Sequence, residues 1–186
     1  STHYETESPV YKFLDRDTVA DASQVAEVNG AQALGLVAAW RGLREGRMLD
    51  QVCQRIEELS KGGKVRADAS LGLIESPAVA EKLKNAGLSV YNHNLETANS
   101  FFGQVCTTHT HQDRINTIKH CQSAGLRVCS GGIFGMGESL EQRIELALEL
   151  QELDVDVVPL NFLVHIYGTP LEKNEPLPPM EILKTI

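Results

Sequence analysis

The feature that most constrains the fold of this chain is a repeated order of helical pattern, glycine and short apolar segment. The order occurs five times between residues 17 and 162. Two occurrences are almost the same phrase, Asn-Ala-Gly-Leu-Ser-Val at 85–90 and Ser-Ala-Gly-Leu-Arg-Val at 123–128. In both, the glycine is typical of the left-handed residue that ends a helix, and the apolar residues after it begin a strand. This alternation predicts an α/β protein in which helices cover a parallel sheet.

The same pattern places the helices and strands along the chain. Helices are expected over residues 17–29, 48–60, 76–86, 111–124 and 139–153. Strands are expected over residues 32–37, 64–69, 89–92, 126–133 and 156–162. Two architectures with parallel strands fit this order, a doubly wound open sheet and a (β/α)8 barrel.

The number of strands and the two chain ends favour part of a barrel. Five strands are too few for a closed eight-stranded barrel, which takes about 250 residues. The chain starts at Ser1 without a methionine, and its last residues, 179–186, resemble the beginning of a helix. We therefore expect a single-domain fragment over residues 1–186, a partial (β/α)8 barrel with about five parallel strands and outer helices.

The composition excludes several classes of protein. Hydrophobic residues make up 42% of the 186 residues, which is enough for a core and excludes a mainly disordered chain. The net charge of −8 disfavours a nucleic-acid or anionic-membrane partner. No apolar stretch is long enough for a membrane helix, and the N-terminus lacks a signal segment. With four cysteines and no Cys-x-x-Cys pair, a reducing, cytoplasmic setting is expected.

Polar residues follow the predicted strands, where parallel α/β proteins carry their chemistry. The clearest group is Asn92, Asn94 and Glu96, which strand alternation places on one face with His93 on the other. Two amides and a carboxylate on one face can hold vicinal hydroxyls or a ureide. The alternative is that the two amides only cap the strand and satisfy the loop backbone.

The glycine-rich segment Ser130–Glu138 lies between a predicted strand and a predicted helix. It contains neither the Gly-x-Gly-x-x-Gly order of dinucleotide sites nor the Lys-Ser/Thr of a phosphate loop. Its glycines permit close approach of the backbone to a flat ligand. The alternative is a tight turn that binds nothing.

Cysteines and histidines at two places in the sequence are candidate metal ligands. Cys106, His109 and His111 have a suggestive spacing, but such a loop is more typical of solvent-facing residues and no fourth ligand is evident. Cys129 ends a predicted strand just before the glycines, and alternation from Val128 turns it toward the barrel interior. We expect it to be the only cysteine of this chain that faces inward.

Four segments together resemble the biotin synthase family of radical S-adenosylmethionine (SAM) enzymes. They are Tyr91–Thr97, Arg127–Glu138, Val158–Asn161 and Gly168–Leu171, and the resemblance runs over essentially the whole chain. It implies a (β/α)8 barrel whose [4Fe–4S] cluster is held by a Cys-x3-Cys-x2-Cys loop after the first strand. In the family a Ser-x-x-Tyr phrase follows that loop, as Ser1–Tyr4 does here. The chain is therefore expected to begin after the cluster motif and to lack it, so that the isolated fragment would be inactive.

The resemblance also assigns binding roles to individual residues. It implies that Asn94 and Glu96 bind the SAM ribose and that Arg114 pairs with the SAM carboxylate. The backbone of Ala38, Ala39 and Trp40 is expected to receive the methionyl amino group, and Ile133 lies in the adenine-side motif. The amides expected to hold a dethiobiotin-like substrate are Asn92, Asn94 and Asn161.

The sequence departs from the family at the second, sulfur-donating cluster. The common [2Fe–2S] cluster uses three cysteines and an arginine, and Cys129 matches one of the cysteines as metal ligand and catalytic residue. The other two positions hold Gly35 and Asp68. Either the second iron–sulfur cluster is of another type, or this member does different chemistry on a related ligand.

The expected function follows from these residues and the resemblance. It is a sulfurtransferase of the biotin synthase type, which cleaves SAM to a 5′-deoxyadenosyl radical and inserts sulfur into dethiobiotin. Its expected partners are the small-molecule substrate and a flavodoxin or ferredoxin as electron donor, and a homodimer stays open. The alternatives are another radical SAM barrel enzyme of maturase or mutase type, or a ligand-binding barrel without iron.

Overall fold

The computed structural model describes residues 13–61 and 64–186. Its helices are α1 Arg16–Val28, α2 Arg47–Lys61, α3 Pro77–Asn85, α4 Asn99–Val105, α5 His111–Ser123, α6 Leu140–Glu152 and α7 Pro179–Thr185. Its longer strands are β1 Ala33–Val37, β3 Arg66–Ser70, β5 Val90–Asn92, β6 Arg127–Cys129, β7 Gly132–Phe134 and β8 Leu160–Phe162. Two short strands, β2 Gly42–Leu43 and β4 Leu73–Ile74, complete the set.

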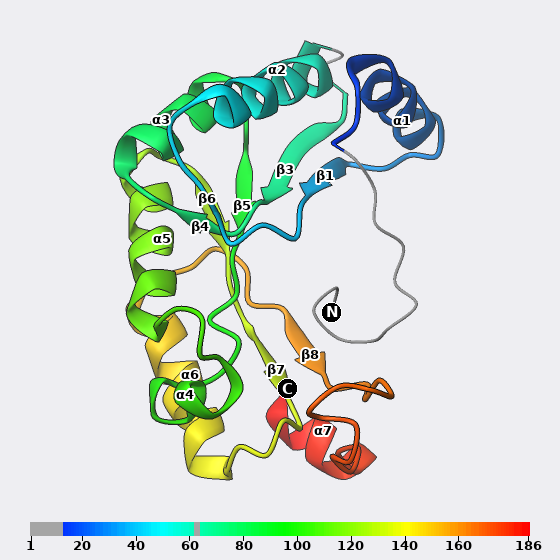
Figure 1. The fold of residues 1–186 in the computed structure, drawn as a ribbon. Helices are drawn as coiled ribbons and strands as arrows, with labels where there is room; N and C mark the ends of the chain where they lie inside the picture. The colour runs from blue at the N-terminus through cyan, green and yellow to red at the C-terminus, as the bar shows by residue number, and fades with distance from the viewer. Residues whose placement is uncertain (1–12, 62–63) are drawn as a thin grey trace.

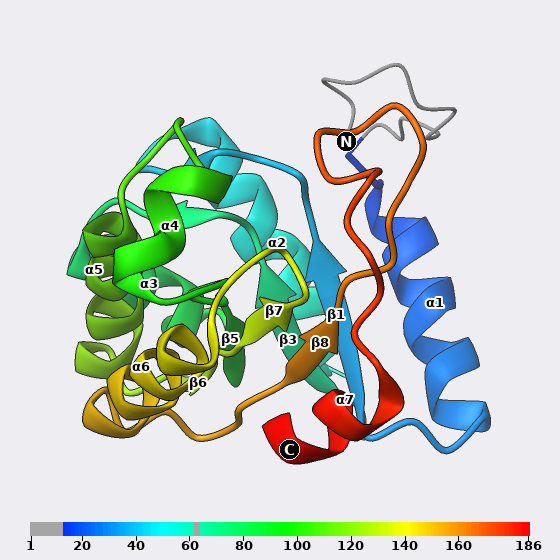
Figure 2. The same ribbon diagram turned by 90° about the horizontal axis from the view of Figure 1, so that it is seen from below.

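All the strand pairs in the described residues are parallel. The main sheet has the order β1-β3-β5-β6, and the pairs β2-β4 and β7-β8 form two small sheets. Figure 1 shows the strands fanning out inside a rim of helices, and Figure 2 shows α3, α5 and α6 outside the strands in a second view. The predicted α/β fold, with parallel strands in sequence order and outer helices, is confirmed.

The two faces of the main sheet differ as strand alternation requires. Tyr91 and Val128 are fully buried in the core, on the side covered by the helices. On the opposite, inner face Gly35 pairs in register with Asp68, and Asn92 with Cys129. Cys129 therefore faces inward.

The remaining three cysteines lie on the outer helices. Cys53 and Cys121 belong to α2 and α5, and Cys106 is the residue that ends α4.

Two predicted strands differ from the observed ones. The single strand expected over 126–133 is two strands, β6 and β7, because the chain changes partner at Ser130 and Gly131. Gly131 runs against Pro159 so closely that an added Cβ would lie 1.9 Å from the Pro159 carbonyl oxygen. The strand expected over 156–162 is shortened to β8, preceded by a single bridge between Cys129 and Val157.

Two helices, α5 and α6, begin at well-formed caps. Thr110 and Asp113 form a reciprocal capping box at the start of α5, and Ser139 and Gln142 form another at the start of α6. Among the described residues, no helix combines the length and the apolar character that crossing a membrane requires.

Candidate active site

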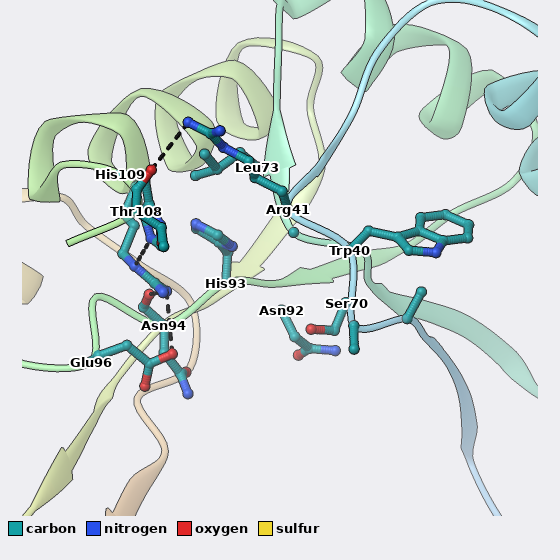
Figure 3. A pocket seen from close by; sticks show the side chains of 14 residues that line it. Trp40, Arg41, Ser70, Leu73, Asn92, His93, Asn94, Glu96, Thr108 and His109 are labelled. Carbon is teal, nitrogen blue, oxygen red and sulfur yellow. Dashed lines mark hydrogen bonds and ion pairs between the residues drawn. The ribbon is translucent and has the colours of Figure 1, made fainter. Parts of the chain in front are cut away.

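A cavity of about 540 Å³ opens at the C-terminal ends of β1, β3 and β5. Seven residues with predicted binding roles line it: Ala38, Ala39, Trp40, Asn92, Asn94, Glu96 and Arg114. Five further polar or charged residues line it that the sequence did not mark as ligand-binding: Arg41, Ser70, His93, Thr108 and His109. Figure 3 shows Asn94 and Glu96 near the 108–109 loop, Asn92 beside Ser70, and His93 between the two groups.

Arg114 connects three parts of one cavity wall. It lies on the second turn of α5, which the capping box begins, and its guanidinium reaches across to the loop after β5. Nη1 donates to the Asn94 carbonyl oxygen at 2.7 Å and to Glu96 Oε1 at 3.2 Å, and Nε donates to His109 Nε2 at 3.0 Å. The guanidinium also lies over the Phe102 ring. Among the described residues Nη2 has no hydrogen-bond partner, so it is free to bind a ligand carboxylate.

Glu96 offers an acceptor to the same cavity. Its backbone is left-handed, with φ of 72°, which turns the chain out of the strand direction. Burial raises the pKa of Glu96 above its ordinary value, and the Arg114 and Asn94 side chains oppose that rise only in part. Oε2 is buried without a hydrogen-bond partner in the described residues. A ligand hydroxyl would satisfy this acceptor, which is the role a ribose requires.

Asn94 links the cavity wall to the sheet. Its Oδ1 accepts a hydrogen bond from the Gly131 N–H at 3.2 Å, where β6 and β7 separate. Its carbonyl oxygen is held by Arg114. The Asn94 side chain therefore satisfies a backbone N–H, as the alternative for the asparagines expected, and it also lines the cavity.

The segment Ala38–Trp40 lies at the end of β1, on another wall. The Ala38 N–H is bonded to the Ser70 carbonyl oxygen, and the Trp40 indole stacks on Phe13, directed away from the other labelled residues in Figure 3. Gly72, with φ of 84°, passes so close that a Cβ would lie 2.4 Å from the Trp40 carbonyl oxygen. The segment lines the cavity, and its predicted role toward an amino group stays a prediction.

The placement of His93 corrects a prediction. Alternation placed it on the opposite face from Asn92, but β5 ends at Asn92 and the His93 side chain lines the same cavity. It is only 7% exposed, and burial, with the charges of Arg114 and His109, lowers its pKa to about 3. His93 is therefore a neutral histidine at physiological pH. The alternation of strand residues could not predict the position of the His93 side chain, because β5 ends one residue earlier, at Asn92.

The loop that carries Cys106, His109 and His111 is not simply solvent-facing. His111 is only 4% exposed, and His109 is half-buried against Arg114. Arg41 donates to the Thr108 carbonyl oxygen at 3.1 Å, which ties the loop to the cavity rim. No group of three or more His, Cys, Asp or Glu side chains suited to a metal occurs in the described part of the chain.

Three predicted site residues are not among those that line this cavity. Cys129 is on β6, Ile133 and Asn161 pair in register on β7 and β8, and none of the three lines the cavity. The Asn161 amide donates to the Gly132 carbonyl oxygen at 3.4 Å. The backbone nonetheless brings these residues close to the cavity, because Glu96 forms a bridge with Gly132 and the Ile133 N–H donates to the Glu96 carbonyl oxygen at 2.8 Å. On the main sheet, Cys129 is the register partner of Asn92, which lines the cavity.

The glycine-rich segment is held by Glu138 rather than left open to a ligand. Its buried carboxylate accepts hydrogen bonds from the Gly135 and Met136 N–H groups and from Arg143 Nε, at 2.9 to 3.1 Å. The carboxylate thereby fixes the turn that precedes α6. This contact agrees with a tight turn at the end of the segment, while Ile133 is partly accessible.

A thiolate-held second cluster does not fit the residues of the inner face. Gly35 has no side chain, and Asp68 accepts two hydrogen bonds from Arg66, at 2.8 and 2.9 Å. Burial, with the nearby Asp68 carboxylate, raises the pKa of the Cys129 thiol. A single thiol of raised pKa beside an arginine-paired carboxylate is a poor ligand set for iron–sulfur chemistry. The 186 residues also contain no Cys-x3-Cys-x2-Cys segment.

Comparison with known proteins decides the family. Residues 11–150 match the radical SAM superfamily. The chain belongs to this superfamily. All 186 residues align with curated biotin synthases, at 44% identity with that of Geotalea daltonii and 45% with that of Trichlorobacter lovleyi. The chain spans 56% of each of these relatives. The predicted resemblance is confirmed.

Two solved enzyme structures share the fold. Methylornithine synthase superposes with a TM-score of 0.79 at 16% identity, covering 96% of this chain and 54% of that one. The FeFe-hydrogenase maturase of Carboxydothermus hydrogenoformans gives 0.75 at 14% identity, covering 97% and 44%. At such low identity the likeness bears on the fold alone, and it agrees with a partial barrel.

Proposed function

We propose that this radical SAM chain binds SAM in the cavity between the end of β1 and the α5 wall. The observation that carries the proposal is the arrangement of Glu96 and Arg114 beside each other, each with an atom free to bind a ligand. Glu96 Oε2 would accept from the ribose hydroxyls, and Arg114 Nη2 would donate to the carboxylate. The backbone of 38–40 would receive the amino group. When bound, SAM supplies the radical chemistry for which the superfamily is named.

The residues around this ligand would orient it and exclude water. His93 stays neutral at physiological pH, so it adds no charge beside the sulfonium of SAM. The 106–110 loop, tied down by Arg41 and Arg114, covers one side of the cavity. Binding energy from these fixed groups would hold the ligand in one pose.

For the whole protein we propose the biotin synthase reaction on a dethiobiotin-like substrate. The support is the curated relatives and the Asn92 amide, which lines the cavity beside the proposed SAM site. An electron donor of the flavodoxin or ferredoxin class would be its partner. Sulfur insertion has support from the relatives only, because Gly35 and Asp68 do not suit a thiolate-held donor cluster.

A second candidate is favoured by those same two residues. A radical SAM enzyme that acts without sulfur insertion needs no thiolates on the inner face. Incubating the full gene product that contains this chain with dethiobiotin, SAM and reductant separates the two. Biotin as product supports the first candidate, and 5′-deoxyadenosine without biotin supports the second.

The SAM site is tested directly by calorimetry on this chain. Glu96→Gln and Arg114→Lys should each weaken SAM binding about 10- to 100-fold, the usual effect of removing a hydrogen bond to a charged partner. The matched control is Arg127→Lys, since Arg127 pairs with Asp156 outside the cavity. Unchanged binding in both cavity variants, or an equal loss in the control, would remove the proposed site.

A further inference from the structure

Two buried polar atoms without partners lie opposite each other between α5 and α6. His111 Nε2, at the start of α5, is 3.7 Å from Glu149 Oε2 on α6. Neither atom has a hydrogen-bond partner in the described residues, and the His111 side chain is only 3% exposed. A buried polar atom without a partner costs free energy, so a single group that satisfied both atoms would stabilise the contact between the two helices.

The backbone around the pair determines which atoms accept. The Thr97 backbone forms a hydrogen bond with the His111 ring that acts to raise its pKa, as a carbonyl acceptor does. Because Nε2 has no partner, the donor is Nδ1, and Nε2 of the neutral ring is an acceptor. The Asn99 backbone N–H donates to the Glu149 carboxylate, and Oε2 is the oxygen left over. With Glu149 ionised, one acceptor therefore lies opposite another.

One proton would satisfy both atoms. A protonated carboxyl has an O–H that can donate to Nε2 once the two atoms approach to about 2.8 Å, and the long glutamate side chain can make that small shift. The gap suits a proton better than a metal ion, since the described residues contain no group of three or more His, Cys, Asp or Glu side chains arranged for a metal.

The charges on α6 favour a proton on Glu149. Burial raises the pKa of Glu149 to about 7, and the neighbouring charges of Glu145 and Glu152 act in the same direction. The Asn99 N–H opposes this rise only in part. The carboxyl group of the pair therefore gains or loses its proton near neutral pH.

The groups on the other elements keep the His111 ring neutral. Burial lowers the pKa of His111, and the charge of Arg114 on α5 acts in the same direction. The helix α4, which packs against both α5 and α6, has no titratable side chain. Glu96 pairs with Arg114, and the pKa of His109 on the adjoining loop is also lowered. The proton is thus carried by Glu149 and accepted by His111.

The pair connects α6 to the wall of the proposed SAM cavity. His111 lies three residues before Arg114 on α5, and its ring is bonded to Thr97, which directly follows Glu96. Figures 1 and 2 show α4 beside α5 and α6 in both views. His111 and Asn99 also line an outer cavity of about 580 Å³, which gives water access to this region. The contact between His111 and Glu149 therefore bears on the position of both SAM-binding side chains.

We propose that His111 and Glu149 form a proton-operated clamp between α6 and the cavity wall. With the proton present, Glu149 Oε2–H donates to His111 Nε2 and the clamp is closed. When the pH rises, the O–H bond breaks, the proton passes to water, and two acceptors are left opposite each other, so the clamp opens. Its contribution to stability is present at acidic pH and is lost as the pH rises through about 7.

The test is a double-mutant cycle of His111→Phe and Glu149→Ala, with unfolding of the 186-residue chain by urea at pH 6 and pH 8. At pH 6 the coupling should change the unfolding equilibrium constant about 3- to 10-fold, the contribution of one hydrogen bond, and at pH 8 it should vanish. The control cycle combines His111→Phe with Glu141→Ala, at an exposed carboxylate on the same helix, and should show no coupling. No coupling at pH 6, or equal coupling at both pH values, would overturn the proposal.

Glu149→Gln provides a second, conservative test. The glutamine amide donates to Nε2 without a proton that titrates, so this variant should match the wild type at pH 6 and be more stable at pH 8. In the Glu96→Gln background, infrared spectra should show a protonated carboxyl group at pH 6 that disappears when Glu149→Gln is added. A carboxyl band that persists, or a Glu149→Gln variant without a gain at pH 8, would contradict the clamp.

A consequence for SAM rests on the proposed function. A closed clamp holds Arg114 and Glu96 in place, so SAM affinity measured by calorimetry should fall between pH 6 and pH 8 more in the wild type than in Glu149→Gln. Equal falls would disprove the connection to the cavity. A wild-type chain that shows the pH-dependent coupling but binds no SAM would contradict the proposed function and leave the clamp supported.

Discussion

Single buried carboxylates do much of the positioning in this molecule. Glu96 turns one oxygen to Arg114 and leaves the other unpartnered, which suits an unfilled ligand site. Glu138 does the opposite, because both of its oxygens are used by backbone N–H groups and by Arg143. The same residue type thus leaves an acceptor open in one place and fixes a turn in the other, and the count of satisfied lone pairs distinguishes the two.

Removing the Glu138 carboxylate should be costly. In Glu138→Ala the buried Arg143 loses its closest partner and two backbone N–H groups lose their acceptor. Breaking one side of a buried pair typically costs about 3–5 kcal/mol. We expect a fall of that size in the free energy of unfolding, measured by urea denaturation. Glu175→Ala, at an exposed carboxylate, should change it by less than about 0.5 kcal/mol.

Helix starts set the geometry of the cavity at the scale of elements. The α5 capping box fixes the backbone one turn before Arg114, so the guanidinium reaches the loop after β5 from a defined direction. The same few residues join the loop bearing Cys106 to the helix bearing Arg114. A change at this cap therefore affects the positions of both Arg114 and Cys106.

Thr110→Ala tests this cap. It should lower the free energy of unfolding by about 1 kcal/mol, the usual cost of losing a threonine N-cap, and should weaken SAM binding because Arg114 is less firmly placed. The comparison variant is Ser139→Ala, which removes the equivalent cap of α6 far from Arg114. We expect a similar stability loss there with no loss of SAM affinity. Equal affinity losses in the two variants would argue against a positioning role for the α5 cap.

Three neutral histidines near the cavity set the acid response of the whole molecule. Burial, followed by the charge of Arg114, lowers the pKa of His93 and His109, and burial also lowers that of His111. Each takes up a proton on unfolding that it does not hold when folded, so stability falls as the pH drops below about 6.5. For His93 the fall continues to about pH 3. Glu149 and Glu96 act in the opposite sense, since burial raises the pKa of both, that of Glu149 to about 7.

The expected outcome is a net loss of stability on acidification. Three histidines outweigh the two glutamates between pH 7.5 and 5, so the urea midpoint should be lower at pH 5. His111→Phe should reduce the pH dependence, because one titrating group is gone and an apolar ring replaces it beside Phe102. A midpoint that is flat or higher at pH 5 would show that these histidines are not buried in the neutral form.

The repeated helices and strands could be predicted from the sequence, but the features that depend on contacts between distant residues could not. Helix and strand order followed from periodicity and from glycines such as Gly87 and Gly125, both of which have positive φ. The short α4 has no side-chain cap at its start, and the two-residue strands carry no period. The break at Gly131 depends on Pro159, 28 residues later in the chain.

The candidate site divides in the same way. Motif resemblance marked Asn94, Glu96 and Arg114, which the structure brings to one cavity. It gave no role to His93 or Arg41, whose presence there depends on where β5 ends and on how a loop folds back. Asn161 was expected to hold the substrate together with Asn92 and Asn94; it lies on β8, and its amide donates to Gly132, which forms a bridge with Glu96. Their binding roles remain predictions.

The hydrogen bond between Asn94 Oδ1 and the Gly131 N–H has a consequence for the sheet itself. It joins a side chain of the cavity to the backbone at the point where β6 gives way to β7. A ligand that pulls the Asn94 amide toward itself must weaken the hydrogen bond from Gly131. A ligand that binds with the Asn94 amide in its present position stabilises the junction of β6 and β7. This one hydrogen bond therefore couples ligand binding in the cavity to the backbone at the junction of β6 and β7.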